Sequence, residues 1–176
     1  MPSVGHVAVG LAAARFPVAT NGRERVAWAL TLVILSCAPD ADVIAFALGI
    51  PYAAPFGHRG ATHSLVVAAL CAAAVAAVAA WRKLPARRMG LIAGLVVASH
   101  GLLDTLTDGG LGCALLWPFS NERFFAPWTP IPVAPIGRAF LSLEGARIAA
   151  IELAAFVPFL IYAIWPALRR GRRATR

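Results

Sequence analysis

The sequence predicts an all-α integral membrane protein, a polytopic bundle of four or five transmembrane helices. Hydrophobic residues make up 60% of the 176 residues and charged residues only 14%, whereas a soluble domain usually carries about 25% charged residues. The mean hydropathy is +0.74. A membrane helix needs about 20 apolar residues, so about five helices fit this apolar content. The composition excludes an ordinary soluble protein, a disordered chain and a collagen-like repeat. We expect one integral membrane domain over residues 1–176.

Five apolar segments are the candidate helices: residues 1–20, 26–50, 62–81, 89–107 and 146–168. The first is short, so we expect it to be tilted or only half buried. The second is long enough to span a membrane but contains Pro39, which can break a helix. We expect Thr62 to cap the third helix, because its hydroxyl can accept a hydrogen bond from the first turn. The Pro-rich loop 108–138 carries tryptophans and phenylalanines and forms either an aromatic belt at the membrane interface or a lid over a site.

The net charge of +8 follows from the expected membrane topology. Twelve of the 16 basic residues form three groups: Arg15, Arg23 and Arg25; Arg82, Lys83, Arg87 and Arg88; and Arg169, Arg170, Arg172, Arg173 and Arg176. Alternating spans put these groups on one side, which the positive-inside rule identifies as the cytoplasm. We therefore expect a multi-pass protein of the inner (cytoplasmic) membrane with a basic cytoplasmic tail at 169–176. No aromatic–basic motif accompanies the charge, so we expect no nucleic-acid partner.

The sequence indicates neither disulfides nor a cleaved leader. Cys37, Cys71 and Cys113 lie in apolar stretches without a CxxC spacing, so we expect buried thiols. No basic residue precedes Arg15, so we expect no cleaved signal peptide.

All four histidines and three of the eight acidic residues converge on the outer end of the expected bundle. They lie at the start of the first helix, in the outward halves of the second and fourth, and around the start of the third: His6, Asp40, Asp42, His58, His63, His100 and Asp104. Ionisable side chains are costly inside a bilayer and mark functional sites there. Scattered structural polar residues would not share one depth.

Six of these residues are candidate metal ligands: His6, Asp40, Asp42, His63, His100 and Asp104. His100 and Asp104 are four apart and share a helix face, although a hydrogen bond that joins two helices would use the same spacing. Asp40 and Asp42 reach one site only if Pro39 breaks the helix; hydrated carboxylates at a kink are the alternative. A catalytic zinc typically uses three protein ligands plus water. We therefore expect one or two divalent ions, with zinc as the expected metal and manganese or iron as alternatives.

Residues 58–64, His-Arg-Gly-Ala-Thr-His-Ser, form the most specific stretch of the chain. A helix start beside an arginine favours an anion. The catalytic candidates are His58, as general acid for the leaving group, and Arg59, which would bind a phosphate or stabilise negative charge. Asp42 would be a ligand or would orient one. The alternative is an interfacial capping loop whose Arg59 reaches lipid head groups.

These motifs resemble the YdjM-type family of inner-membrane metal-dependent hydrolases. The matching elements are Gly5-His6, Pro39-Asp40-Ala41-Asp42, residues 58–64, Ser99-His100 with Asp104, Thr107, and the Leu-Leu-Trp-Pro run at 115–118. They cover about residues 5–118, and the last helix, 146–168, carries no motif. The resemblance implies a membrane-embedded metal hydrolase without implying a particular substrate.

We therefore expect a membrane-embedded metal-dependent hydrolase that acts on a lipid or lipid-linked phosphoester at the outer leaflet, facing the periplasm or exterior. A divalent metal would activate the attacking water. One alternative is a zinc-dependent lipid amidase, since alkaline ceramidases also place His, Asp and Ser in a membrane bundle. Another is a non-catalytic metal-binding protein or a transporter. Transport would require polar groups in both leaflets, and the cytoplasmic halves of the expected spans have almost none.

Overall fold

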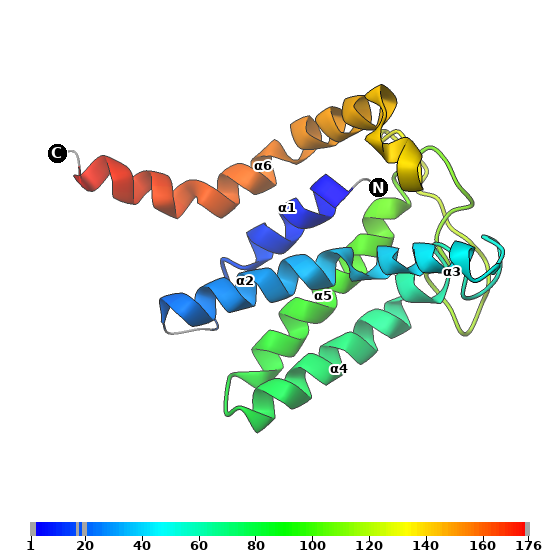
Figure 1. Ribbon diagram of the computed structural model, residues 1–176. Coiled ribbons are helices and arrows are strands. Elements are labelled where there is room, and N and C mark those ends of the chain that lie inside the picture. The colour runs from blue at the N-terminus through cyan, green and yellow to red at the C-terminus, as the bar shows by residue number, and fades with distance from the viewer. Residues whose placement is uncertain (1–2, 17, 19–20, 175–176) are drawn as a thin grey trace.

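The computed structural model describes residues 3–16, 18 and 21–174, and within that part it is helical, with two isolated β-bridges and no strand (Figure 1). The elements are α1 (Ser3–Ala13), α2 (Gly22–Cys37), the 3₁₀ turn η1 (Ala38–Val43), α3 (Ile44–Ala47), η2 (Ala61–His63), α4 (Leu65–Trp81), α5 (Ala86–Asp104), η3 (Gly137–Leu141) and α6 (Leu143–Ala174). The expectation of an all-α protein is confirmed for these residues.

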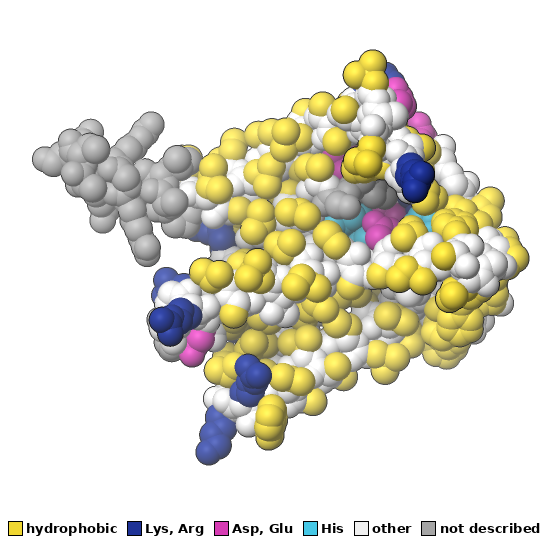
Figure 2. All heavy atoms as spheres, viewed as in Figure 1, with side chains coloured by type: hydrophobic (Ala, Val, Ile, Leu, Met, Phe, Trp, Pro, Cys, Tyr) yellow, Lys and Arg dark blue, Asp and Glu magenta, His cyan; other side chains and the backbone are white. Residues whose placement is uncertain are grey.

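Among the described residues, two helical stretches are long and apolar enough to cross a membrane. They are Gly22–Ala47, which runs from α2 through α3, and Leu143–Trp165 of α6. Helices α1 and α4 contribute shorter apolar stretches, Val4–Ala13 and Leu65–Trp81. Large apolar side chains on the outer faces of the helices are exposed, including Leu30, Leu70, Leu95 and Ile164, and they cover much of the surface in Figure 2. Such a surface suits hydrocarbon rather than water.

Helices α4 and α5 pack closely because small residues line their contact. Gly90 and Gly94 are four apart on α5 and face Ala72 and Ala76 on α4. Glycines at this spacing let two membrane helices approach until their backbones touch. The G-x-x-x-G pattern is visible in the sequence and explains why α4 and α5 form a tight antiparallel hairpin.

Gly90→Ala should lower the stability of this hairpin. In an open helix alanine is more favourable than glycine by about 1 kcal/mol. Here the new Cβ would lie 2.7 Å from the Ala72 carbonyl oxygen and 2.8 Å from the Ala76 Cβ, and such overpacking costs about 1–3 kcal/mol. The melting temperature in detergent should therefore fall. Gly22→Ala is the matched control, because its Cβ would meet nothing within 4 Å; an equal fall in both variants would contradict the packing argument.

Helix α1 lies between α2 and α6 and packs against both (Figure 1). A Cβ on Gly10 would lie 2.9 Å from the Leu32 carbonyl oxygen, so glycine is needed where α1 meets α2. At its other end, Arg15 donates a hydrogen bond to the Tyr162 carbonyl oxygen over 2.7 Å. That carbonyl has no helical donor because residue 166 is proline, which lacks an amide hydrogen. The Arg15 contact therefore satisfies a break in α6 and ties α6 to α1.

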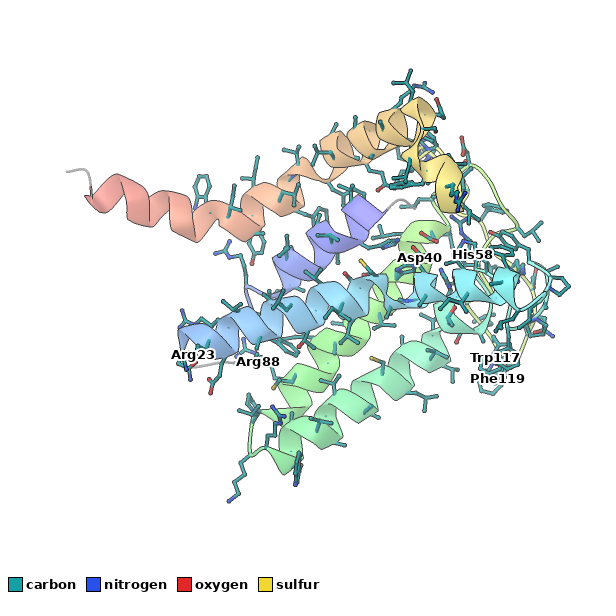
Figure 3. The ribbon with its side chains drawn as sticks, viewed as in Figure 1. Arg23, Asp40, His58, Arg88, Trp117 and Phe119 are labelled. Carbon is teal, nitrogen blue, oxygen red and sulfur yellow. The ribbon has the colours of Figure 1, made fainter. Side chains whose placement is uncertain are left out.

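The two ends of the bundle differ in charge. Figure 3 shows Arg23 and Arg88 at one end, and Asp40, His58, Trp117 and Phe119 at the other. In Figure 2 the visible His side chains lie in a hollow between α6 and the α2–α3 stretch, away from most Lys and Arg. The histidines and the basic turns therefore occupy opposite ends. The expected basic tail, 169–176, lies outside the residues whose side chains are described.

Three local expectations need correction. Ser64, and not Thr62, caps α4, because its hydroxyl accepts a hydrogen bond from the Val67 amide over 3.1 Å. Thr62 instead lies in the preceding turn η2. The last helix begins at Leu143 rather than at 146 and continues to Ala174, past the expected end at 168. Within the loop 108–138, Gly137 and Arg138 already belong to η3.

Candidate metal centre

The centre is assembled where α2 ends. Pro39 lies in the first turn of η1, so the chain leaves the α-helix at Cys37 and tightens into a 3₁₀ turn. This turn brings both nearby carboxylates to one imidazole: Asp40 Oδ1 lies 3.6 Å from His63 Nε2, and Asp42 Oδ2 lies 3.2 Å from His63 Nδ1. In a regular helix, residues two apart would face different directions. The proline therefore accounts for the convergence of Asp40 and Asp42.

Four residues form the larger of two groups of candidate metal ligands among the described residues. Their ligand atoms lie within 4.8 Å of one another: Asp40, His63, His100 and Asp104. His63, His100 and Asp104 are buried, while the Asp40 side chain is 25% exposed. His6 lies beside this group rather than in it; its ring stacks on His100 at 3.7 Å, and its Nε2 lies 3.2 Å from Asp104 Oδ1. The group therefore presents two imidazoles and two carboxylates, with Asp40 toward solvent.

The backbone of α5 approaches His63 closely enough to complete this group. A Cβ on Gly101 would lie 2.4 Å from the His63 carbonyl oxygen. Glycine at the position after His100 is therefore what lets the two histidines meet.

The outer nitrogens of both imidazoles are held by hydrogen bonds. His100 Nδ1 donates to the Ser36 carbonyl oxygen over 2.6 Å, in the last turn of α2, where carbonyls lack helical partners. His63 Nδ1 lies 3.0 Å from the Thr62 hydroxyl and faces Asp42. Hydrogen bonds of this kind fix the tautomer and ring orientation of metal-binding histidines. They leave Nε2 of each ring to face the centre.

The two Nε2 atoms lie only 3.1 Å apart. With both Nδ1 atoms protonated, neutral rings would direct two lone pairs at each other. The pair therefore requires a cation, which is either a proton on one ring or a metal ion that both rings bind. Two nitrogens on one tetrahedral metal, at bonds of about 2.0 Å, are about 3.3 Å apart. The donor set and its spacing therefore fit a divalent ion.

The electrostatics of the centre also favour a cation. Burial alone would lower the pKa of His63, but its contacts with the carboxylates of Asp104, Asp40 and Asp42 raise it to about 10. A buried imidazole prefers its charged form only where negative charge is concentrated. By contrast, burial raises the pKa of the nearby Cys113 thiol to about 12. Among the described residues, Cys113 belongs to neither group of side chains that could hold a metal ion.

Asp42 and His58 form a separate pair beside the centre. His58 Nδ1 donates to Asp42 Oδ1 over 2.6 Å, while the second Asp42 oxygen accepts hydrogen bonds from the Thr62 hydroxyl and the Arg59 amide. Asp42, Asp40 and His58 also form a second group that could hold an ion. Because the Asp42 oxygens already accept several hydrogen bonds, this carboxylate is placed to orient His58 and His63.

Arg59 is buried in the middle of these residues, with 2% of its surface exposed. Its Nε lies 3.1 Å from Asp104 Oδ2, and its Nη1 donates to the Thr107 hydroxyl and the Gly109 carbonyl oxygen. None of its hydrogen bonds among the described residues uses Nη2. Its φ of 59° is rare outside glycine, so the surrounding contacts hold this conformation. The expectation of a lipid-facing Arg59 does not match this burial.

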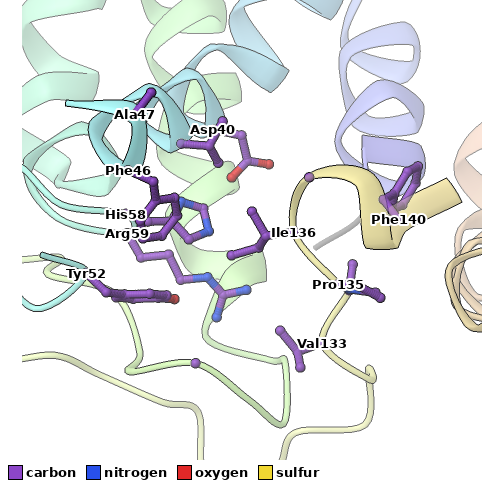
Figure 4. Close-up of a pocket in the computed structure, with 14 residues that line it drawn as sticks. Asp40, Phe46, Ala47, Tyr52, His58, Arg59, Val133, Pro135, Ile136 and Phe140 are labelled. Carbon is purple, nitrogen blue, oxygen red and sulfur yellow. The ribbon is translucent and has the colours of Figure 1, made fainter. Parts of the chain in front are cut away.

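The cavity beside the centre has a volume of about 820 Å³. Asp40, His58 and Arg59 form its polar wall (Figure 4). Apolar lining comes from the end of η1, from α3, and from the chain that leads into and through η3: Val43, Phe46, Ala47, Val133, Ala134, Pro135, Ile136 and Phe140. In Figure 4, the Arg59 guanidinium reaches toward Val133 and Ile136 across the cavity. A cavity lined by both polar and apolar side chains suits an amphiphilic ligand.

Arg123 is important to the site but carried no sequence motif. Its Nη1 donates to the carbonyl oxygens of His58 and Gly112, and its Nη2 to those of Tyr52 and Ala54. One guanidinium thus fastens the loop that carries His58 to the long loop after α5. A charged residue inside a Pro-rich loop gives no periodic pattern that would reveal this role.

Arg123→Lys should loosen the His58 loop. Lysine has no planar fork and cannot donate to carbonyls on both sides, and losing a hydrogen bond from a charged group costs about 1.5–3 kcal/mol. Proteolysis and hydrogen exchange in residues 50–60 should become faster. Arg138→Lys, an exposed change in η3, is the control. Unchanged protection in the Arg123 variant would contradict the proposed fastening.

Glu152 on α6 was also missed. It is fully buried, and its Oε2 accepts a hydrogen bond from the Gly5 amide at the start of α1 over 3.2 Å. The contact holds the turn that carries His6. The available signal was an acid between Ile151 and Leu153 in an apolar span, which is costly without a purpose.

Two comparisons with known proteins found relatives. A family described as YdjM inner membrane protein matches residues 1–171. The inner membrane protein YbcI of Escherichia coli (strain K12) is 46% identical over 104 residues, which cover 58% of this chain and 60% of that protein. The chain thus aligns with about three fifths of this relative. No solved structure matches.

Proposed function

Because the chain belongs to the YdjM inner membrane protein family, we propose that it is a membrane-embedded, metal-dependent hydrolase of a lipid or lipid-linked phosphoester. The observation that carries the proposal is the pair of buried Nε2 atoms, on His63 and His100, that lie 3.1 Å apart. Two carboxylates surround this pair and a cavity adjoins it. This combination of a cation site and an adjoining cavity suits a hydrolase.

The metal would be one divalent ion held by Asp40, His63, His100 and Asp104, with His6 supporting Asp104. Zinc is the expected metal, and manganese or iron would fit the same mixed donors. When bound, it would supply a Lewis acid that activates water for attack. A second ion at Asp42 and His58 would have to displace their 2.6 Å hydrogen bond, so one ion is the simpler arrangement.

His58 and Arg59 would act on the substrate. His58 Nδ1 donates to Asp42, so its Nε2 can accept a proton from water or return one to the leaving oxygen. The two hydrogens of Arg59 Nη2 would bind a phosphate oxygen and stabilise its developing charge. The three negative charges of the aspartates would be balanced by the positive charges of Arg59 and a divalent ion. A phosphate anion would therefore not be repelled, which favours a phosphoester over an amide.

The membrane orientation follows from the charge distribution. We propose a bundle of four or five membrane helices. Four of them are α2–α3, α4, α5 and α6, and α1 is a half-buried fifth. The turn after α4 and the start of α2 are basic and would lie in the cytoplasm, together with the tail at 169–176. The metal centre, at the opposite end, would then face the periplasm or exterior.

Hydrolysis assays on purified protein in mixed micelles would test the function. The panel contains phospholipids, lipid-linked phosphoesters and ceramides. We expect phosphoester cleavage that a chelator abolishes and added zinc, manganese or iron restores. Cleavage of ceramides alone would indicate a lipid amidase. Bound metal without turnover on any lipid would indicate a non-catalytic metal-binding protein, and either result would overturn the proposal.

A further inference from the structure

We infer that the cavity binds a membrane phospholipid that enters sideways from the bilayer, between α3 and η3, with an acyl chain along the apolar wall and the phosphate toward Arg59. This inference depends on the proposed function only for the identity of the bond that is cleaved. The entry route and the chain-binding wall follow from the cavity and its flanks.

The cavity lies between two apolar segments of the chain. One apolar wall belongs to α3, which ends the candidate span Gly22–Ala47. The other belongs to residues 133–140, which lead through η3 into the candidate span Leu143–Trp165. The cavity therefore lies between the ends of two helices that are apolar enough to cross the membrane. A ligand that enters the cavity from the side would therefore come from the membrane rather than from the solution above it.

The outer faces of those two walls are apolar. On the α3 side, Ile44 is 61% exposed and Leu48 is 70% exposed. On the η3 side, Leu141 is 87% exposed and Leu143 is 90% exposed. Large exposed apolar side chains that cluster on a surface mark contact with a membrane or another apolar partner. Apolar flanks keep a passing acyl chain in contact with hydrocarbon.

The lining of the cavity is polar in one part and apolar in another. Phe46 lies beside His58 on the side of the cavity that also carries Asp40 and Arg59, and Ile136 and Phe140 lie on the opposite, apolar side (Figure 4). Asp40 is the partly exposed member of the larger ligand group. A phospholipid lying across the cavity would thus place its phosphate beside the candidate metal and its chain against the apolar wall. A water-soluble phosphoester would leave that wall without a contact.

Photo-crosslinking in nanodiscs tests this inference without catalysis. The protein is treated with a chelator and reconstituted with a phospholipid that carries a diazirine in its acyl chain, and adducts are mapped by mass spectrometry. We expect adducts at Phe46, Ile136 or Phe140 in excess over the outer faces of α4 and α5. Ile136→Trp should fill the cavity and reduce these adducts about tenfold, which corresponds to about 1.4 kcal/mol of binding free energy.

Leu70→Trp is the matched control, because it adds the same bulk to an exposed leucine on the outer face of α4 that does not line the cavity. It should leave the adducts unchanged. Adducts spread evenly over the lipid-facing helices, or equal labelling in both variants, would overturn the inference. Metal-dependent cleavage of a lipid-linked phosphoester without cavity labelling would overturn the inference and leave the proposed function standing. Cavity labelling without any hydrolysis would support the inference and contradict the proposed function.

Discussion

Asp104→Asn and His63→Ala should each lose the bound metal and the hydrolytic activity together. Asp104 touches His6, Arg59 and His63, so its charge is central to the proposed cation site. Removing a residue that only supports a metal ligand costs about 10–100-fold in affinity, and removing a ligand should cost more. Elemental analysis and turnover, measured on the same purified preparations, check this prediction.

Folding has to be separated from metal binding in these variants. Asp104→Asn leaves the buried Arg59 without its ion-pair partner, and an uncompensated buried charge can cost about 3–5 kcal/mol. His63→Ala creates no such charge, so it tests the metal claim if the first variant is unstable. Glu144→Gln is the control, because it removes an exposed carboxylate paired only with Arg147. Full activity in folded His63→Ala would contradict the assigned centre.

His58→Asn should keep the metal and lose most of the turnover. The asparagine side-chain amide can replace His58 Nδ1 as donor to Asp42, but nothing replaces Nε2 beside the cavity. Loss of a general acid or base typically slows the reaction about 10²–10⁴-fold. Metal content should remain at the wild-type level, which would separate His58 from the ligands.

Tyr52→Phe is the matched control for His58→Asn, since Tyr52 lines the same cavity and the change removes only a hydroxyl. It should retain most of the turnover. Loss of metal from His58→Asn would instead place His58 among the ligands, as part of the second group with Asp40 and Asp42. Wild-type turnover in His58→Asn would exclude a proton-transfer role.

The sequence predicted that these polar side chains lie together, because ionisable groups are so restricted inside a membrane. His100 and Asp104 share a helix face, and Asp40 follows Pro39 near the end of an apolar stretch. In hydrocarbon such groups must satisfy one another. Their common depth therefore predicted that they meet. In the structure they meet where η1, η2 and α5 come together. The roles assigned to them remain predictions.

The sequence was insufficient where loops decide the contacts. The contacts of Arg59 Nε and Nη1 could not be predicted, because they depend on the path of residues 104–109. Arg123 acts on backbone carbonyls of a distant loop, and backbone atoms leave no trace in a residue pattern. Ser64 rather than Thr62 caps α4 because the turn η2 delays the helix start.

Two further patterns in the sequence correspond to contacts in the structure. Gly90 and Gly94 form the G-x-x-x-G spacing of a close helix pair, and they set the α4–α5 packing. Glu152 interrupts an apolar span and binds the turn that carries His6. The last helix, which carries no recognised motif, therefore still contributes to the centre.

The most direct measurement is the metal content of the purified wild-type protein beside His63→Ala. Inductively coupled plasma mass spectrometry on protein extracted without chelators would count zinc, manganese and iron per chain. We predict about one divalent ion per wild-type chain, as expected for one site of four protein donors, and almost none in the variant. No metal in the wild-type protein, or equal metal in both, would contradict a metal centre at Asp40, His63, His100 and Asp104.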